Sequence, residues 1–259
     1  MGFSSKLINW YHQNKRDLPW RNSTDPYQIW LSEIILQQTR VDQGLSYFNK
    51  FIEHHPNVNS LANAPEKEVL NLWQGLGYYS RARNLHFTAK VISKEHKGIF
   101  PSDYNDILKL KGVGEYTAAA IASFAYNLSY PVIDGNVYRV LSRIFGIENP
   151  IDSSKGKKIF KALATELIDN KNPATYNQAI MEFGALQCTP KKPKCEDCPF
   201  RLECYALKNE LTAELPKKEK KIKQRNRYFN YVVVIDNEKI YLKERKEKDI
   251  GQVYMTFLY

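Results

Sequence analysis

The strongest constraint on the fold is the helical periodicity of the first two hundred residues. Apolar side chains recur there at spacings of three and four, and prolines and glycines mark the breaks. In the stretch DPYQIWLSEIILQQT, Asp25 suits an N-cap and Pro26 suits the first helical position. No segment before residue 228 alternates like a strand for long, so this part of the chain is predicted to be all-α.

The expected helices can be placed by number. An amphipathic helix follows the first few residues, another follows Asp25, and a third starts at Pro65 in APEKEVLNLWQGL. Further helices are expected near 80–95, 103–110, 116–126, 136–146, 156–169 and 173–187. Helix therefore follows helix through this whole region.

The composition changes sharply at 217–227. This stretch, KKEKKIKQRNR, has seven basic residues and one acidic residue, and it is predicted to be an exposed linker. The segments YFNYVVVID and IYLKER then flank a short turn, which is typical of a β-hairpin. Only about thirty residues lie beyond the linker, too few to bury a domain core. We expect a helical domain at 1–216, the linker at 217–227 and an incomplete β domain at 228–259.

The charge of the chain indicates an anionic partner. The formal net charge is +10 and the sequence pI is about 9.2, which suits nucleic acid, a membrane surface or an acidic protein. No window approaches 18 uninterrupted apolar residues, so no membrane-spanning segment is predicted. The N-terminus lacks the pattern of a secretory signal. A cytosolic protein without a membrane partner is expected.

All four cysteines fall within seventeen residues, in the stretch CTPKKPKCEDCPFRLEC. Two disulfides would be unusual in a cytosolic chain, and structural zinc sites usually pair two Cys-x-x-Cys knuckles where only one is present. Four thiolates on one compact loop suit a [4Fe–4S] cluster. The spacing favours this cluster, with zinc as the alternative. The candidate ligands are Cys188, Cys195, Cys198 and Cys204.

The stretch LKGVGEYTAAAIASF places two glycines directly before an apolar helical run. Gly112 and Gly114 permit backbone conformations closed to other residues, and the next helix begins with free N–H groups that suit an anion. A helix-hairpin-helix holds a DNA phosphate in this way without reading its sequence. The alternative is a plain tight turn, but the nearby Asp134-led helix and the clustered cysteines favour the hairpin.

Two carboxylates stand out. Asp134 directly precedes the helix of VIDGNVYRVLSR, where it is either a helix N-cap or a negative charge beside a cationic sugar. Glu33 lies in the apolar run IWLSEIILQQT, where it is either an exposed position or a residue buried for a reason.

In this order, the hairpin, VIDGNVYRVLSR and the cysteine loop resemble the endonuclease III superfamily of base-excision DNA glycosylases over about residues 5–205. Four further stretches are similar to the MutY-type adenine DNA glycosylases of that superfamily: RDLPWR, WLSEIILQQTRV, LWQGLGYYSRARNL and YNQAIMEFGALQC. The resemblance implies an all-α helix-hairpin-helix glycosylase fold with an iron–sulfur cluster loop, followed by the start of a Nudix-like β domain.

The resemblance also implies a mechanism. Glu33 would be the general acid that protonates N7 of adenine, with its pKa raised by burial. Asp134, with Tyr116 nearby, would stabilise or transiently capture the oxocarbenium ion, and Asn136 would orient Glu33. Bifunctional relatives carry a lysine where Tyr116 stands, and a phenol cannot form a Schiff base. Base removal without efficient strand cleavage is therefore expected. The alternative for Tyr116 is simple packing against a helix.

Recognition residues follow from the same motifs. Trp20 and Arg21 resemble the wall of the adenine pocket, and Glu182 resembles the residue that reads the adenine edge. The alternatives are a surface glutamate at 182 and an ordinary helix C-cap at GLGYY. The residues expected to enter the duplex or hold its backbone are Gln37, Gln38, Thr39, Tyr78, Gly112, Val113 and Gly114.

The implied function is that of a monofunctional, monomeric, nucleoid-associated glycosylase that excises adenine opposite 8-oxoguanine or guanine in double-stranded DNA. In relatives a Nudix-like domain helps to recognise 8-oxoguanine, and 228–244 resembles its first hairpin. The sequence departs from the family at KDIGQVYMTFLY, where relatives continue, so the strength of the 8-oxoguanine preference stays open. The alternatives are a thymine/guanine mismatch glycosylase and a non-catalytic DNA-binding module.

Overall fold

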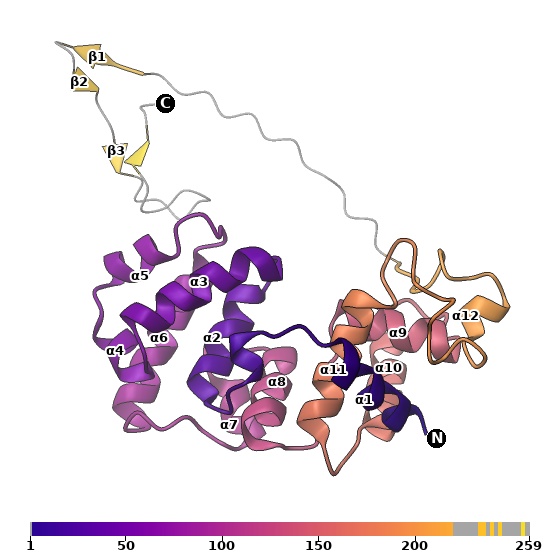
Figure 1. The fold of residues 1–259 in the computed structure, drawn as a ribbon. Helices are drawn as coiled ribbons and strands as arrows, with labels where there is room; N and C mark the ends of the chain where they lie inside the picture. The colour runs from indigo at the N-terminus through magenta and orange to yellow at the C-terminus, as the bar shows by residue number, and fades with distance from the viewer. Residues whose placement is uncertain (1, 220–232, 237–238, 241–242, 245–254, 257–259) are drawn as a thin grey trace. The chain divides into compact units, whose positions relative to one another are not determined.

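The computed structural model describes residues 2–219, 233–236, 239–240, 243–244 and 255–256 (Figure 1). The chain divides into two compact units, Met1–Glu219 and Lys220–Tyr259. Within the described residues, no helix is long and apolar enough to cross a membrane.

The first unit is helical, as predicted. Its elements are α1 (Phe3–Asn14), η1 (Pro19–Arg21), α2 (Pro26–Leu36), α3 (Val41–His54), α4 (Val58–Asn63), α5 (Glu66–Leu72), α6 (Ser80–Glu95), α7 (Tyr104–Lys109), α8 (Glu115–Tyr126), α9 (Gly135–Phe145), α10 (Ser154–Leu167), α11 (Pro173–Leu186) and α12 (Tyr205–Lys208). The predicted ranges from 80 onward agree with α6 to α11 to within two residues. Helices α3, α4 and α12 were not among the predicted ranges.

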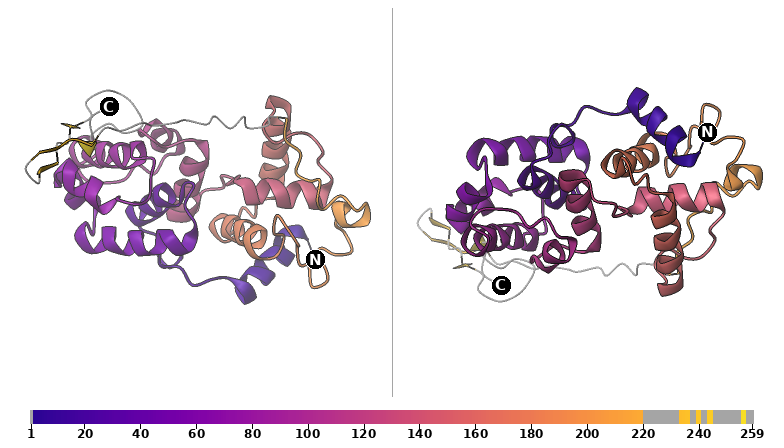
Figure 2. Two further views of the ribbon diagram at one scale, coloured as in Figure 1. Left: turned by 90° about the horizontal axis from the view of Figure 1, so that it is seen from above. Right: turned by 90° about the horizontal axis from the view of Figure 1, so that it is seen from below.

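Two hydrophobic cores divide this unit into lobes. The first lobe, η1 to α8, is built around Trp30 and Trp73, which are completely buried. The second lobe consists of α1 and α9 to α12, with Phe160 and Phe183 at its centre. The chain passes between the lobes twice, through residues 15–18 and again through 127–134 (Figures 1 and 2).

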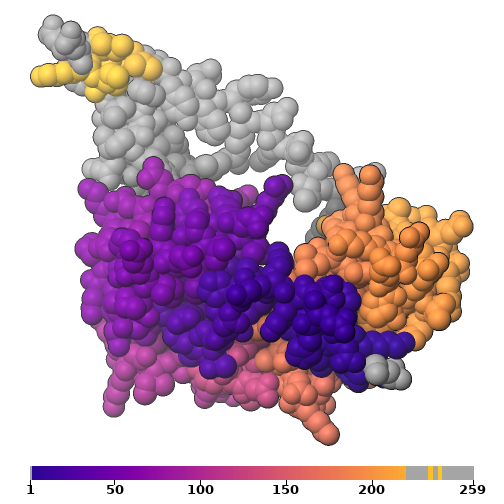
Figure 3. Space-filling view, in the orientation of Figure 1, coloured from indigo at the N-terminus to yellow at the C-terminus, as the bar shows by residue number. Residues whose placement is uncertain are grey.

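Small side chains set the closest helix contacts. Four of the five alanines of α8 are buried, so this helix packs tightly against α2 in the first lobe. In the second lobe α11 packs on α1 and α9. A Cβ at Gly184 would lie 2.5 Å from the Cβ of Asn136, so glycine permits the close approach of α11 to the start of α9. In the space-filling view, the indigo N-terminal residues cover the front of the second lobe and reach across to the first lobe (Figure 3).

The second unit contributes two short strand pairs. β1 (Ile235–Asp236) pairs antiparallel with β2 (Lys239–Ile240), in the register Ile235 to Ile240. β3 (Lys243–Glu244) pairs antiparallel with β4 (Met255–Thr256), in the register Lys243 to Thr256. The β1–β2 pairing agrees with the centre of the predicted hairpin. Residues Lys243 and Glu244, expected in its second strand, pair with β4 instead, and 228–232, 237–238 and 241–242 lie outside the described part of the chain. A Nudix-like domain remains a prediction.

The start of the predicted linker is attached to the first unit. The N–H of Ile151 donates to the carbonyl of Lys217 at 3.0 Å, and Lys217 Nζ contacts Glu148 Oε2 at 2.7 Å. The N–H of Glu219 donates to Asp152 at 2.8 Å. Residues 220–227 of the predicted linker lie outside the described residues.

Candidate active site

A cavity of about 430 Å³ is lined by side chains of both lobes. Its volume is within the roughly 300–1,000 Å³ typical of small-molecule sites. The structure brings to it eight of the residues that sequence analysis selected. These are Trp20, Arg21, Glu33, Thr39, Tyr116, Asp134, Asn136 and Glu182.

Glu33 is buried in the middle of α2. This helix is apolar on nearly all sides, with Ile29, Leu31 and Ile34 in the core, so Glu33 is only 6% exposed. Burial raises the pKa of Glu33 from 4.5 to about 7. A hydrogen bond with Tyr116 opposes this rise and the charge of Asp134 adds to it. A large share of Glu33 is therefore protonated at neutral pH.

Asp134 is both a helix cap and a wall of the cavity. Its Oδ1 accepts from the N–H of Val137 at 2.8 Å, which caps α9, and its Oδ2 accepts from Asn136 Nδ2 at 2.7 Å. Burial raises the pKa of Asp134, and these hydrogen bonds act against the rise. The two interpretations of this residue are thus compatible, because capping fixes the orientation of a carboxylate that also faces the cavity.

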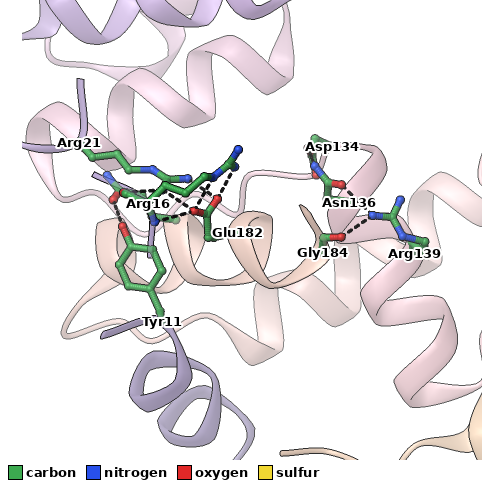
Figure 4. Close-up of polar contacts among 9 residues, drawn as sticks. Tyr11, Arg16, Arg21, Asp134, Asn136, Arg139, Glu182 and Gly184 are labelled. Carbon is green, nitrogen blue, oxygen red and sulfur yellow. Dashed lines mark hydrogen bonds and ion pairs between the residues drawn. The ribbon is translucent and has the colours of Figure 1, made fainter. Parts of the chain in front are cut away.

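Asn136 was expected to orient Glu33, and the structure gives it other partners. Its amide donates to Asp134 and its Oδ1 accepts from Arg139 Nη2 at 2.8 Å (Figure 4). Asn136 follows Asp134 on the first turn of α9, so the hydrogen bond within that turn is local. A contact between Asn136 and Glu33 would instead join two residues that are far apart in the sequence.

Arg139 links this turn to the cysteine loop and was not among the predicted site residues. Besides Asn136, its guanidinium donates to the carbonyl of Gly184 at 2.7 Å and to that of Cys188 at 2.7 Å. Arg139 is 8% exposed. The available signal was a pair of arginines, Arg139 and Arg143, four residues apart and each next to an apolar position of the same helix.

Tyr116 lies on the first turn of α8 and is half-buried at the cavity. Burial raises its pKa well above 10, and the negative charges of Glu33 and Asp134 act in the same direction. The phenol is therefore neutral, and it hydrogen-bonds to the carboxyl of Glu33. Tyr116 therefore contacts the Glu33 carboxyl in the cavity and also packs against the neighbouring helices.

Glu182 is the centre of a buried ion cluster rather than a surface residue of α11, since it is 1% exposed. Arg16 donates to it from its backbone N–H at 2.9 Å, from Nε at 2.9 Å and from Nη2 at 2.6 Å. Arg21 donates from Nη1 at 2.8 Å and from Nη2 at 2.7 Å (Figure 4). Arg16 belongs to the RDLPWR stretch and was not among the predicted site residues.

These contacts determine the charge of Glu182. Burial alone would raise its pKa, but the hydrogen bonds from Arg21 and Arg16 outweigh that effect and lower the pKa to about 2. Glu182 is therefore ionised, and both of its oxygens are occupied by donors. The cluster holds two guanidinium groups at one wall of the cavity.

Glu182→Gln should destabilise the protein by about 3 kcal/mol at pH 7, because it removes one charge from a buried ion cluster. A lowered pKa stabilises the fold above the unfolded pKa of about 4.3, and that contribution is lost as the pH falls toward 2. The difference in the free energy of unfolding between the variant and the wild type should thus be smaller at pH 3.

Denaturant unfolding at pH 7 and pH 3 measures this difference. Glu166→Gln, at an exposed position of α10, is the control. Equal stability of the Glu182 variant and the wild type at pH 7 would contradict this prediction.

The predicted hairpin joins α7 and α8. Gly112 has a φ of +83°, and a Cβ there would lie 2.8 Å from the Cβ of Asn84, so only glycine fits. Val113 is buried and anchors the turn in the first lobe. Gly114 precedes α8 without any side-chain cap, which leaves the first N–H groups of the helix available to an anion. The hairpin residues lie outside the lining of the cavity.

The other predicted DNA-contacting residues lie on two loops. Gln37 and Gln38 follow α2, and Tyr78 precedes α6. None of the three lines the cavity, unlike Thr39. Gln38 and Tyr78 are exposed, Tyr78 to 69%. Both have a positive φ, +58° and +47°, which is uncommon for residues other than glycine.

The four cysteines are free thiols that line one separate cavity in the second lobe. Arg143 Nη1 lies 3.5 Å from Cys188 Sγ and 2.7 Å from the carbonyl of Thr189. Burial raises the pKa of each thiol, that of Cys198 to about 11, so the metal-free thiols carry protons. In the described part of the chain, no three His, Cys, Asp or Glu side chains stand close enough to hold a single metal ion. Four thiols around one cavity match the donor set of a [4Fe–4S] cluster, with zinc as the alternative.

The sequence of this chain is similar to those of known DNA repair proteins. Residues 31–167 match the family model described as HhH-GPD superfamily base excision DNA repair protein. The adenine DNA glycosylase of Buchnera aphidicola subsp. Acyrthosiphon pisum is 38% identical over 256 residues, which cover 98% of this chain and 73% of that protein. The adenine DNA glycosylase of Homo sapiens is 41% identical over 213 residues, covering 79% and 39%.

Solved structures agree on the fold. The structure of a thermostable thymine-DNA glycosylase has a TM-score of 0.74 and 30% identity, covering 80% of this chain and 95% of that one. A non-covalent endonuclease III–DNA complex has a TM-score of 0.68 at 20% identity, covering 80% and 94%. The predicted helix-hairpin-helix glycosylase fold is thereby confirmed.

Proposed function

The chain belongs to the HhH-GPD superfamily of base excision DNA repair proteins, and we propose that it excises adenine opposite 8-oxoguanine or guanine. As a DNA glycosylase it is a hydrolase of N-glycosyl bonds. The observation that carries the proposal is one cavity with two carboxylates in different environments: Glu33, whose pKa is about 7, and Asp134, which is held by hydrogen bonds.

Each of these residues has a chemical task in the proposed reaction. The adenine is extruded from the duplex into the cavity. Protonated Glu33 gives its proton to N7 of the base, so that adenine leaves as a neutral group. Ionised Asp134 stabilises the positive charge that develops on the sugar, and water completes the hydrolysis. The neutral phenol of Tyr116 holds the Glu33 carboxyl in place and lies beside the same charge.

The choice of adenine over thymine rests on two observations. Relatives that cover most of this chain carry the name adenine DNA glycosylase, at 38–39% identity. The cluster of Glu182, Arg16 and Arg21 also gives the cavity a polar wall with donors that could meet a purine edge. The likeness to a thymine-DNA glycosylase makes thymine opposite guanine the competing substrate.

A substrate panel separates these possibilities. Single-turnover rates would be measured on duplexes with A opposite 8-oxoguanine, A opposite guanine and T opposite guanine. Adenine excision from the first two, without release of thymine, is expected. Release of thymine would favour the mismatch-glycosylase alternative. Binding without excision of any base would favour a non-catalytic DNA-binding module.

We expect a monofunctional enzyme, because Tyr116 offers no amine for a Schiff base. End-labelled duplex incubated with the protein should therefore stay intact until hot alkali cleaves the abasic site. The control for background cleavage is the same duplex, incubated without protein and then given the same alkaline treatment. Strand scission that equals base release before alkali would contradict the assignment of Tyr116.

We also propose that Cys188, Cys195, Cys198 and Cys204 hold a [4Fe–4S] cluster. All four thiols face one cavity, and Arg139 and Arg143 hold the adjoining backbone. When bound, the cluster would supply a fixed cross-link between both ends of the loop. The proposal extends to a helical glycosylase domain at 1–216, a linker at 217–227 and an incomplete Nudix-like segment at 228–259. We propose that the protein acts as a monomer on nucleoid DNA.

A further inference from the structure

Arg81, on the first turn of α6, joins two loops that are far apart in the sequence. Its Nη1 donates to the carbonyls of Ile34 and Ile35 at 3.1 Å each and of Gln37 at 2.5 Å. Its Nη2 donates to the carbonyls of Leu76 at 3.1 Å and Gly77 at 3.3 Å. We infer that Arg81 is a positioning residue that holds loop 37–39 and loop 75–79 as one unit for insertion into the duplex.

The side chain suits this task because a guanidinium is a rigid planar fork. One nitrogen serves the end of α2 and the other serves the loop before α6, so the two directions of the fork are used separately. The group also lies 5.0 Å from the centre of the buried Trp73 ring. Trp73 Nε1 donates to the carbonyl of Gly77 at 3.0 Å, so the fork and the indole hold the same loop. A lysine ammonium, a single point of charge, cannot reproduce this arrangement.

The two loops need such support, because each presents a strained residue to solvent. Gln38 and Tyr78 are exposed and have positive φ. A backbone conformation of this kind is maintained only where surrounding contacts stabilise it, and such residues are found mostly at functional sites. Arg81 binds the carbonyl of Gln37 and that of Gly77, the residues directly before the two strained positions. Arg81 therefore fixes the backbone directly before Gln38 and directly before Tyr78.

This inference rests on the proposed function, in which a base leaves the duplex and protein side chains fill the gap. The extrusion of one base requires that its neighbours and its partner be held at the same time. If Gln38 and Tyr78 stand at a fixed separation before DNA arrives, less conformational freedom is lost on binding. Arg81 would thus act on base extrusion rather than on bond cleavage.

Arg81→Lys tests this, with Arg83→Lys as the control on the same helix. Arg83 contacts Glu66 at 3.7 Å, and its replacement also keeps a positive charge. Base extrusion is followed by the fluorescence of 2-aminopurine placed beside the mispaired adenine, in a Glu33→Gln background so that excision does not interfere. Excision is followed in otherwise wild-type protein, on adenine opposite guanine and on adenine opposite an abasic site, where extrusion is easier.

Arg81→Lys should lose most of the 2-aminopurine increase and should excise adenine opposite guanine at least about tenfold more slowly, given the sensitivity of such steps to small misplacements. With the unpaired adenine the loss should be under about threefold. Arg83→Lys should match the wild type throughout. Wild-type behaviour of Arg81→Lys, or an equal loss on both substrates, would overturn the inference. If the wild type excises no base but extrusion still depends on Arg81, the glycosylase proposal fails and this inference stands.

Discussion

Glu33→Gln should slow base excision by about 10²–10⁴-fold and leave duplex binding unchanged, because general-acid catalysis contributes a factor of that size. Glutamine keeps the shape of the side chain and can still accept the hydrogen bond of Tyr116. It cannot donate the proton that makes adenine a good leaving group. Single-turnover excision measures the first effect, and a binding titration with the same duplex measures the second.

The matched control is Glu166→Gln, an exposed position in α10 that should excise at the wild-type rate. Excision by Glu33→Gln at the wild-type rate would remove Glu33 as the acid. Loss of binding together with excision would mean that the substitution had damaged the site rather than its chemistry.

The same variant should change stability in a direction set by the pKa of Glu33. A folded-state pKa raised from 4.5 to about 7 stabilises the fold at low pH, and this contribution is lost as the pH rises through about 7. Glutamine does not ionise, so the variant should gain on the order of 3 kcal/mol relative to the wild type between pH 4 and pH 9. Denaturant unfolding at both pH values measures the difference. A constant difference would mean that the buried carboxyl does not titrate as inferred.

Cys198→Ser should yield protein that folds poorly and lacks the brown colour of an iron–sulfur cluster. The described loop from Cys188 to Cys204 contains no helix or strand, so a bound cluster would supply much of its order. Its Phe200 and Cys204 belong to the core of the second lobe. For such a loop, the free energy of metal binding is part of the free energy of folding.

Visible absorbance, iron content per chain and thermal unfolding test this expectation. Glu196→Ser is the matched control, because it lies in the same loop at an exposed position and leaves every thiol intact. It should keep the colour and the stability. A soluble, active Cys198→Ser variant with full stability would contradict a structural cluster.

The boundaries of the later helices were predictable because their ends carry strong local signals. Asp103 and Asp134 cap α7 and α9 by side-chain hydrogen bonds, and Gly146 ends α9 in the left-handed conformation. Helix α3 lacked such a signal, since Arg40 gives it no side-chain cap and Gly44 is a poor helix former within its sequence. Only the tertiary packing explains why position 44 is a glycine, because a Cβ there would lie 2.7 Å from Leu36 Cδ2.

The sequence predicted several residues that line the cavity, but it did not predict the residues with which they form hydrogen bonds and ion pairs. The burial of Glu33 could be anticipated, since the neighbouring residues of its helix are apolar. The ion cluster of Glu182 could not, because it depends on Arg16, a residue 166 positions away in the sequence. The bridging role of Arg139 depends likewise on the close approach of α9 and α11, which only the folded chain reveals.

The measurement that tests the central claim most directly is the pH dependence of adenine release in a single turnover. With Glu33 as the acid, the rate should fall about tenfold per pH unit above about pH 7, as the carboxyl loses its proton. On the acid side it should fall as Asp134, whose pKa is raised by burial, becomes protonated. A rate that stays constant from neutral pH to pH 9 would contradict proton donation by Glu33.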